Sequence, residues 1–181
     1  MNKLYVFSGA SGVGKSTVLK QVMEGREDLF FSVSATTRAA RPGEVDGVNY
    51  YFISHERFAE MIRDDAFVEY DEHMGNFYGT PKEQLEEKLQ RGNVILDIEP
   101  NGAFRVRAQR PDAVLVFITP PSMEELERRL RGRGDTSEEQ IQMRLERARW
   151  EIEQSAAYDH IVVNDQVDTC VAKILDIIDA E

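Results

Sequence analysis

The stretch Gly9-Ala10-Ser11-Gly12-Val13-Gly14-Lys15-Ser16-Thr17 decides how this chain folds, because it fits the phosphate-binding pattern G-x-x-x-x-G-K-[ST]. It lies between the apolar run 4–7, which is typical of a strand, and residues 17–23, which can continue as a helix. Glycines let the backbone approach an anion closely, and the N-terminus of the following helix then points at phosphate oxygens. The sequence therefore predicts a P-loop that binds ATP, in which Lys15 reaches the β- and γ-phosphates and Ser16 coordinates Mg²⁺.

The composition predicts one soluble domain with a sizeable core. The chain has 181 residues, of which 41% are hydrophobic and 30% are charged. No apolar run approaches the roughly 20 residues that a bilayer-spanning helix needs, and residues 1–3 lead directly into a strand rather than a cleavable leader. The single cysteine, Cys170, excludes an internal disulfide and is expected to pack beside the apolar face of a helix. We therefore expect a cytoplasmic protein that does not bind membranes.

The charge balance restricts the partners of this protein. Its 22 basic and 33 acidic residues give a net charge of −11, which argues against general binding of nucleic acid. An anionic nucleotide must then be met by locally clustered cations, so the positions of the arginines are informative.

Apolar segments of strand type recur along the chain, at 4–7, 94–98, 114–118 and 160–163, with helical patterns between some of them. Nearly continuous apolar runs are typical of parallel strands that are buried on both faces. This alternation predicts an α/β fold, with a parallel sheet flanked by helices.

Residues 32–80 break this rhythm and predict a small, mostly β insertion. Its predicted strands lie within 32–38, 48–53, 67–70 and 76–80. A helix is expected to follow Ser54 as its N-cap. Another is expected to begin with Thr80 as N-cap, Pro81 at the first position and Glu83 completing a capping box.

Residues 122–155 predict a pair of helices, the first opened by a capping box at Ser122 and ended by the turn 131–134, the second running to about Gln154. Seven arginines fall in this segment, at positions 128, 129, 131, 133, 144, 147 and 149. Several are expected to pair with acidic neighbours four residues away. Arginines in the turn and on the second helix could instead close over a nucleotide as a lid.

Two further features carry chemistry. Asp97 ends an apolar strand, where a P-loop protein places an aspartate that helps to hold Mg²⁺ directly or through water, although such a residue is also common as a cap. The loop 35–43 carries Arg38 and Arg41, whose guanidinium forks match phosphate oxygens, and nearby tyrosines offer hydroxyl donors. A second phosphate site predicts a phosphorylated acceptor, and so a nucleotide kinase rather than a switch or motor.

In these residues the chain resembles the guanylate kinases over nearly its full length. Besides the P-loop, the stretches that carry the resemblance are 34–38, 41–44, Gly47-Val48-Asn49-Tyr50, Gly75-Asn76-Phe77-Tyr78-Gly79-Thr80-Pro81, Leu96-Asp97-Ile98, Pro120-Pro121-Ser122, Arg131-Gly132-Arg133-Gly134 and Val163-Asn164-Asp165. The family's usual Asp-Ile-Asp-x-Gln-Gly stands here as Asp97-Ile98-Glu99-Pro100-Asn101-Gly102.

The resemblance implies one domain that phosphorylates GMP and dGMP with ATP, in purine nucleotide metabolism. It implies a core at 1–31, 81–121 and 156–181, a GMP-binding insertion at 32–80 and a lid at 122–155. The GMP phosphate would be held by Arg38, Arg41, Tyr50 and Tyr78, the guanine by Ser34, Glu69 and Thr80, and Glu99 would lie at the floor of this site. Asn164 would lie near the adenine of ATP, and Arg133 and Arg144 would stabilise the transferring phosphoryl group.

Two alternatives are open on the sequence. A related P-loop kinase could phosphorylate a sugar phosphate on a similar frame. A non-catalytic guanylate-kinase-like module could bind phosphorylated protein segments, although such a module needs no working P-loop, and Gly14-Lys15-Ser16 is complete here.

Overall fold

The computed structural model describes residues 1–132, 134 and 136–181, which divide into two compact units. The first unit comprises residues 1–6 and 28–113, and the second unit comprises 7–27 and 114–181. Strand β1 (Leu4–Gly9) contributes its first residues to one unit and its last residues to the other.

The main sheet has five strands in the order β2-β7-β1-β8-β9. Its other strands are β2 (Leu29–Phe31), β7 (Asn93–Asp97), β8 (Val114–Thr119) and β9 (His160–Val163), and β2–β7 and β8–β9 pair in parallel. The central strands are buried along nearly their whole length, as their apolar runs predict. The predicted α/β fold and its strands are confirmed. The sequence did not predict the short edge strand β2, because three residues are too few to show a hydrophobic pattern.

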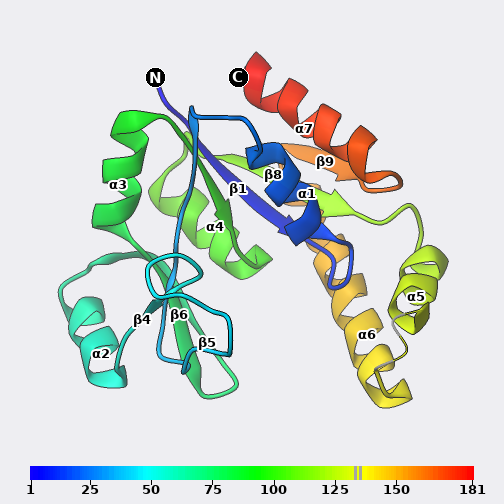
Figure 1. The fold of residues 1–181 in the computed structure, drawn as a ribbon, viewed down its shortest axis with the longest axis horizontal. Coiled ribbons are helices and arrows are strands. Elements are labelled where there is room, and N and C mark those ends of the chain that lie inside the picture. The colour runs from blue at the N-terminus through cyan, green and yellow to red at the C-terminus, as the bar shows by residue number, and fades with distance from the viewer. Residues whose placement is uncertain (133, 135) are drawn as a thin grey trace. The chain divides into compact units, whose positions relative to one another are not determined.

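The helices of the second unit are α1 (Lys15–Met23), α5 (Met123–Gly132), α6 (Glu138–Gln154) and α7 (Val167–Ala180), and the short 3₁₀ helix η1 (Ser155–Ala157) follows α6. Helices α1 and α7 lie side by side (Figure 1). The predicted stop and restart of the helix pair is confirmed, since Ser137 caps α6 in a full capping box with Gln140. Cys170 is buried in α7, and burial raises the pKa of its thiol to about 11, as suits a packing residue.

The first unit carries a second sheet of four strands, in the order β4-β3-β6-β5. Its strands are β3 (Ala35–Thr36), β4 (Tyr51–Phe52), β5 (Phe67–His73) and β6 (Asn76–Pro81), and helix α2 (His55–Arg63) begins at the predicted cap Ser54. Phe58 of α2 stacks on Phe67 of β5 with ring centroids 4.4 Å apart, which gives this sheet its own small core. The mostly β character is confirmed, but β3 and β4 are far shorter than the predicted segments.

Helices α3 (Lys82–Arg91) and α4 (Pro100–Gln109) complete the first unit. The capping box predicted at Thr80 is wrong. Pro81 is the N-cap of α3 and makes no side-chain cap bond. Thr80 lies within β6, and its hydroxyl donates to the Glu69 carboxylate. Because β6 continues through Pro81, the helix begins one residue later than predicted, and Thr80 keeps its place in the strand opposite Glu69.

Within the described ranges, no helix combines the length and the apolar character that crossing a bilayer requires.

Candidate active site

Glycines give the P-loop its shape. Gly12 and Gly14 have φ angles of 85° and 89°, in the left-handed region that favours glycine, and Gly14 is the N-cap of α1. A Cβ on Gly12 would lie 2.7 Å from Leu130 Cδ2, and one on Gly9 would lie 2.8 Å from the Ile118 carbonyl oxygen. The backbone conformation therefore favours glycine at positions 12 and 14, and the Ile118 carbonyl oxygen leaves no room for a Cβ at position 9.

The P-loop is anchored within the second unit by three further bonds. Val13 N–H donates to the Ala10 carbonyl at 3.0 Å, and Asn164 Nδ2 donates to the Val13 carbonyl at 2.8 Å. Ser11 N–H donates to Glu151 Oε2 at 2.8 Å. The loop thus has a fixed conformation, from which α1 starts at Lys15.

Asn164 is 3% exposed, and its position is further fixed by a main-chain bond to the Thr119 carbonyl at 2.8 Å. Its side-chain Oδ1 is buried and has no hydrogen-bond partner among the residues that the structure describes. Buried polar atoms are normally satisfied, so this acceptor beside the P-loop can still take a hydrogen bond from a donor outside the chain.

Several arginines of the predicted helix pair are held in ion pairs. Arg129 and Arg131 form ion pairs with the glutamates four residues before them, and Arg131 also pairs with Glu138 of α6, as predicted for several members of this group. Arg144 is exposed on α6. Arg133 lies outside the described residues.

In the first unit, the loop after β3 builds a cluster of cationic and phenolic groups. Arg38 lies over the Tyr50 ring at 5.4 Å, and the Tyr50 ring meets that of Tyr78 edge-on, with centroids 6.0 Å apart. Burial raises the pKa of Tyr50, which therefore stays a hydroxyl donor. The structure thus brings together three of the four predicted phosphate-binding residues, and the fourth, Arg41, is exposed on the same loop.

Glu44 holds this cluster in place and was not among the predicted site residues. Both of its oxygens accept from the Arg38 guanidinium at 2.9 Å, and its Oε2 also accepts from the Arg41 main-chain N–H at 2.7 Å. These bonds lower the pKa of the Glu44 carboxyl to about 2, and the bonds from Arg38 make the largest contribution. The one signal in the sequence was an acidic residue within an otherwise basic loop.

The second cluster of the first unit is formed by Glu69 and Thr80, which face each other across β5 and β6. Thr80 Oγ1 donates to Glu69 Oε1 at 2.7 Å, and the two residues are 0% and 7% exposed respectively. Burial raises the pKa of Glu69, an effect that the Thr80 bond partly offsets. Ser34 directly precedes β3, whose Ala35 pairs with Gly79, so the antiparallel register places Ser34 next to Thr80.

The start of α4 provides room beside the Glu69 carboxylate. A Cβ built on Gly102 would lie 3.0 Å from Glu69 Oε2, so glycine avoids a close contact with this oxygen. Glu99 is the N-cap residue of α4 without a side-chain cap bond and is exposed. Asp97 ends β7 half-buried, and its charge is one of those that raise the pKa of Tyr50.

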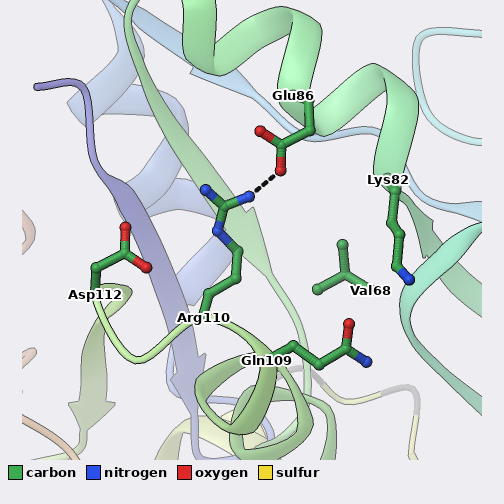
Figure 2. Close-up of a pocket in the computed structure, with 6 residues that line it drawn as sticks. All are labelled: Val68, Lys82, Glu86, Gln109, Arg110 and Asp112. Atoms are coloured by element: carbon green, nitrogen blue, oxygen red, sulfur yellow. Dashed lines mark hydrogen bonds and ion pairs between the residues drawn. The ribbon is translucent and has the colours of Figure 1, made fainter.

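A separate surface pocket of the first unit is lined by Val68, Lys82, Glu86, Gln109, Arg110 and Asp112 (Figure 2). Its lining includes none of the predicted site residues. Figure 2 shows Arg110 paired with Glu86, and Lys82 Nζ lies 2.7 Å from Asp65. Because both cations already have carboxylate partners, we do not assign a phosphate to this pocket.

A P-loop after the first strand of a parallel sheet, together with a second cluster of arginine and tyrosines, defines a P-loop protein equipped for two phosphate groups. Among the described residues no cluster of three or more acidic, histidine or cysteine side chains could hold a metal by itself.

Comparison with known proteins identifies the family. The family model described as Guanylate kinase matches residues 1–181, so the chain belongs to the guanylate kinase family, which confirms the resemblance seen in the sequence. The chain is 51% identical to a guanylate kinase of Thermus thermophilus, over 99% of this chain and 81% of that protein. It is 49% identical to one of Streptococcus pneumoniae, over 98% and 86% respectively. A crystal structure of guanylate kinase from Anaplasma phagocytophilum superposes with a TM-score of 0.78, at 35% identity, covering 99% of this chain and 85% of that one.

Proposed function

We propose that the P-loop of the second unit binds ATP and that the two clusters of the first unit bind GMP. The chain is an ATP-dependent phosphotransferase that converts ATP and GMP into ADP and GDP. The observation that carries the assignment of the acceptor is the buried Glu69–Thr80 pair. Its carboxylate matches the two adjacent donors of guanine, the N1–H and the 2-amino group, which adenine does not offer.

ATP would be held by the P-loop residues 9–17, with its phosphates on the first turn of α1 and on Lys15. The orphaned Oδ1 of Asn164 would accept from the adenine amino group. Hydroxyl and carboxylate oxygens suit Mg²⁺, which binds to few protein ligands and completes its shell with phosphate and water, so Ser16 and Asp97 fit this ion. Bound there, Mg²⁺ would neutralise charge on the transferring phosphoryl group.

GMP would place its phosphate on Arg38, Arg41, Tyr50 and Tyr78, and its base on Ser34, Glu69 and Thr80. Glu44 holds the Arg38 guanidinium in a fixed orientation. Gly102 avoids a close contact with Glu69 Oε2, which would accept from the base. Glu99, exposed at the start of α4, would lie at the edge of this site.

The reaction needs no general base, because the attacking oxygen belongs to an ionised phosphate. The protein contributes alignment and charge neutralisation, by Lys15, Arg38, Arg144 and Arg133. We retain the division into a core (1–31, 81–121 and 156–181), a GMP-binding insertion (32–80) and an arginine-bearing lid (122–155) as part of this proposal.

The raised pKa of Glu69 predicts that GMP binding depends on pH. Only the ionised carboxylate accepts from both guanine donors, so below its pKa a proton must leave before GMP binds. We expect GMP affinity to rise by up to about tenfold per pH unit through this range, which lies above the ordinary value of 4.5, and then to level off. In the ligand-free protein the same shift means that the contribution of Glu69 to stability falls as pH rises from 4.5 through the raised pKa.

Calorimetry of GMP binding across this pH range, in buffers of different ionisation enthalpy, measures the released proton. The phosphate of GMP also releases a proton, near pH 6, so the Glu69→Gln variant is the control that retains only the phosphate contribution. Identical pH profiles for the wild type and this variant would show that Glu69 is not the titrating group.

A coupled assay of ADP release, with ATP–Mg²⁺ and a panel of GMP, dGMP, AMP, UMP and ribose phosphates, tests the proposed function. Turnover confined to GMP and dGMP is the expected result. Turnover on a ribose phosphate would overturn the acceptor assignment and point first to Glu99 and Asn101. A folded sample that turns over no acceptor and binds no ATP would favour the phosphopeptide-binding alternative.

A further inference from the structure

Glu151 is a buried carboxylate that the reaction described above does not use. It lies in the last third of α6 and is 4% exposed. Its Oε2 accepts from the main-chain N–H of Ser11 at 2.8 Å, and its Oε1 accepts from Arg147 Nε at 3.1 Å. A buried carboxylate is costly unless it is hydrogen-bonded or paired, and here one of its bonds is to the P-loop itself, 140 positions away in the sequence.

This bond decides which part of the P-loop is offered to phosphate. The N–H of Ser11 is committed to Glu151, and the N–H of Val13 is committed to the Ala10 carbonyl. The first turn of α1 begins directly afterwards, and a helix binds phosphate at that turn. The hydrogen bond from Ser11 to the Glu151 carboxylate therefore fixes the first half of the P-loop. The conformation of the loop in turn sets the direction of the N–H groups at the start of α1.

The same bond ties the P-loop to the helix that carries Arg144. Residues seven positions apart in an α-helix lie on the same face, about two turns from each other, so Arg144 and Glu151 share a face of α6. Arg147, one turn before Glu151, holds the other carboxylate oxygen. The Ser11–Glu151 bond thus fixes the position of α6, and with it the backbone of Arg144, relative to the P-loop.

We propose that Glu151 is a positioning residue for phosphoryl transfer. It fastens the P-loop to α6 and so sets both the conformation of the P-loop and the position of the helix that carries Arg144. This role rests on the proposed binding of ATP at the P-loop. It predicts that loss of the carboxylate acts on the use of ATP and not on the binding of GMP, because every proposed GMP contact lies in the first unit.

The test compares Glu151→Ala and Glu151→Gln in steady-state kinetics, with each substrate varied in turn. Glu151→Ala is expected to lower kcat/KM for ATP by about 10- to 100-fold, while KM for GMP stays within about twofold. Glu151→Gln retains an acceptor oxygen for Ser11 and should recover to within about fivefold of the wild type. Glu153→Gln removes the same charge from an exposed position of the same helix and should match the wild type.

A purely structural role would lower the thermal midpoint of Glu151→Ala without changing kcat or KM for ATP well below that midpoint, and this result would overturn the proposal. If Glu151→Ala does not fold, Glu151→Asp decides, because it keeps the charge but is one methylene too short to keep the bond to Ser11: an unchanged kcat/KM for ATP together with an unchanged affinity for a non-hydrolysable ATP analogue overturns the proposal. The wild type is assayed first, because absence of its turnover overturns the proposed function instead. The positioning role is then judged on analogue binding alone, where weakening in Glu151→Ala but not in Glu153→Gln supports it.

Discussion

Replacing Lys15 with methionine is expected to lower kcat by about 10³-fold or more, with GMP affinity within about twofold of the wild type. Lys15 opens α1 directly after the left-handed Gly14, so its ammonium group is carried by the same turn that offers its N–H groups to phosphate. Methionine keeps the length of the side chain and the helix propensity but removes the charge. The loss therefore measures the neutralisation of the transferring phosphoryl group, and the ADP-release assay with GMP calorimetry records both quantities.

Lys20→Met is the matched control for this prediction. Lys20 lies on the same helix and is exposed, and its replacement removes an equal charge. We expect wild-type rates for it, since exposed charges away from the site are screened by solvent and salt. Full activity in Lys15→Met, in a correctly folded sample, would remove the P-loop from the mechanism.

The features that the sequence predicted correctly depend on neighbouring residues. The P-loop is recognisable because the glycines and Lys15 are needed at fixed spacings within a single turn. The buried strands β1, β7 and β8 are recognisable because both of their faces require apolar residues. The two-residue strands β3 and β4 give no such pattern, since their place is set by pairing with β6 and with each other.

The features that the sequence missed depend on partners that are distant along the chain. Glu151 resembles any other glutamate of an acidic helix until the fold brings it to Ser11. Thr80 fits a capping box by local spacing, but the register of β5 against β6 gives its hydroxyl a carboxylate acceptor. Local patterns thus identify where a chain turns or enters the core, whereas the partner of a polar side chain is decided by strand register and helix packing.

Replacing Glu69 with glutamine is expected to lower kcat/KM for GMP by about 10²- to 10³-fold, with the low activity on AMP unchanged or slightly raised. Thr80 occupies Glu69 Oε1, so recognition of the base depends on Oε2 and on the remaining capacity of Oε1. Glutamine keeps the shape but replaces one acceptor oxygen with an amide donor. That donor would face either the Thr80 hydroxyl or the donors of guanine, and the preference for GMP over AMP should fall accordingly.

The readout that separates base recognition from folding is the ratio of kcat/KM for GMP to that for AMP, because a general loss of folded protein lowers both values equally. Glu72→Gln, at an exposed position of the same strand, should leave this ratio unchanged. The Glu69→Gln variant should also be more stable than the wild type above the raised pKa of Glu69, since it no longer buries a charge that burial disfavours. An unchanged GMP-to-AMP ratio in Glu69→Gln, alongside that gain in stability, would mean that Glu69 is a buried structural carboxylate and that another group reads guanine.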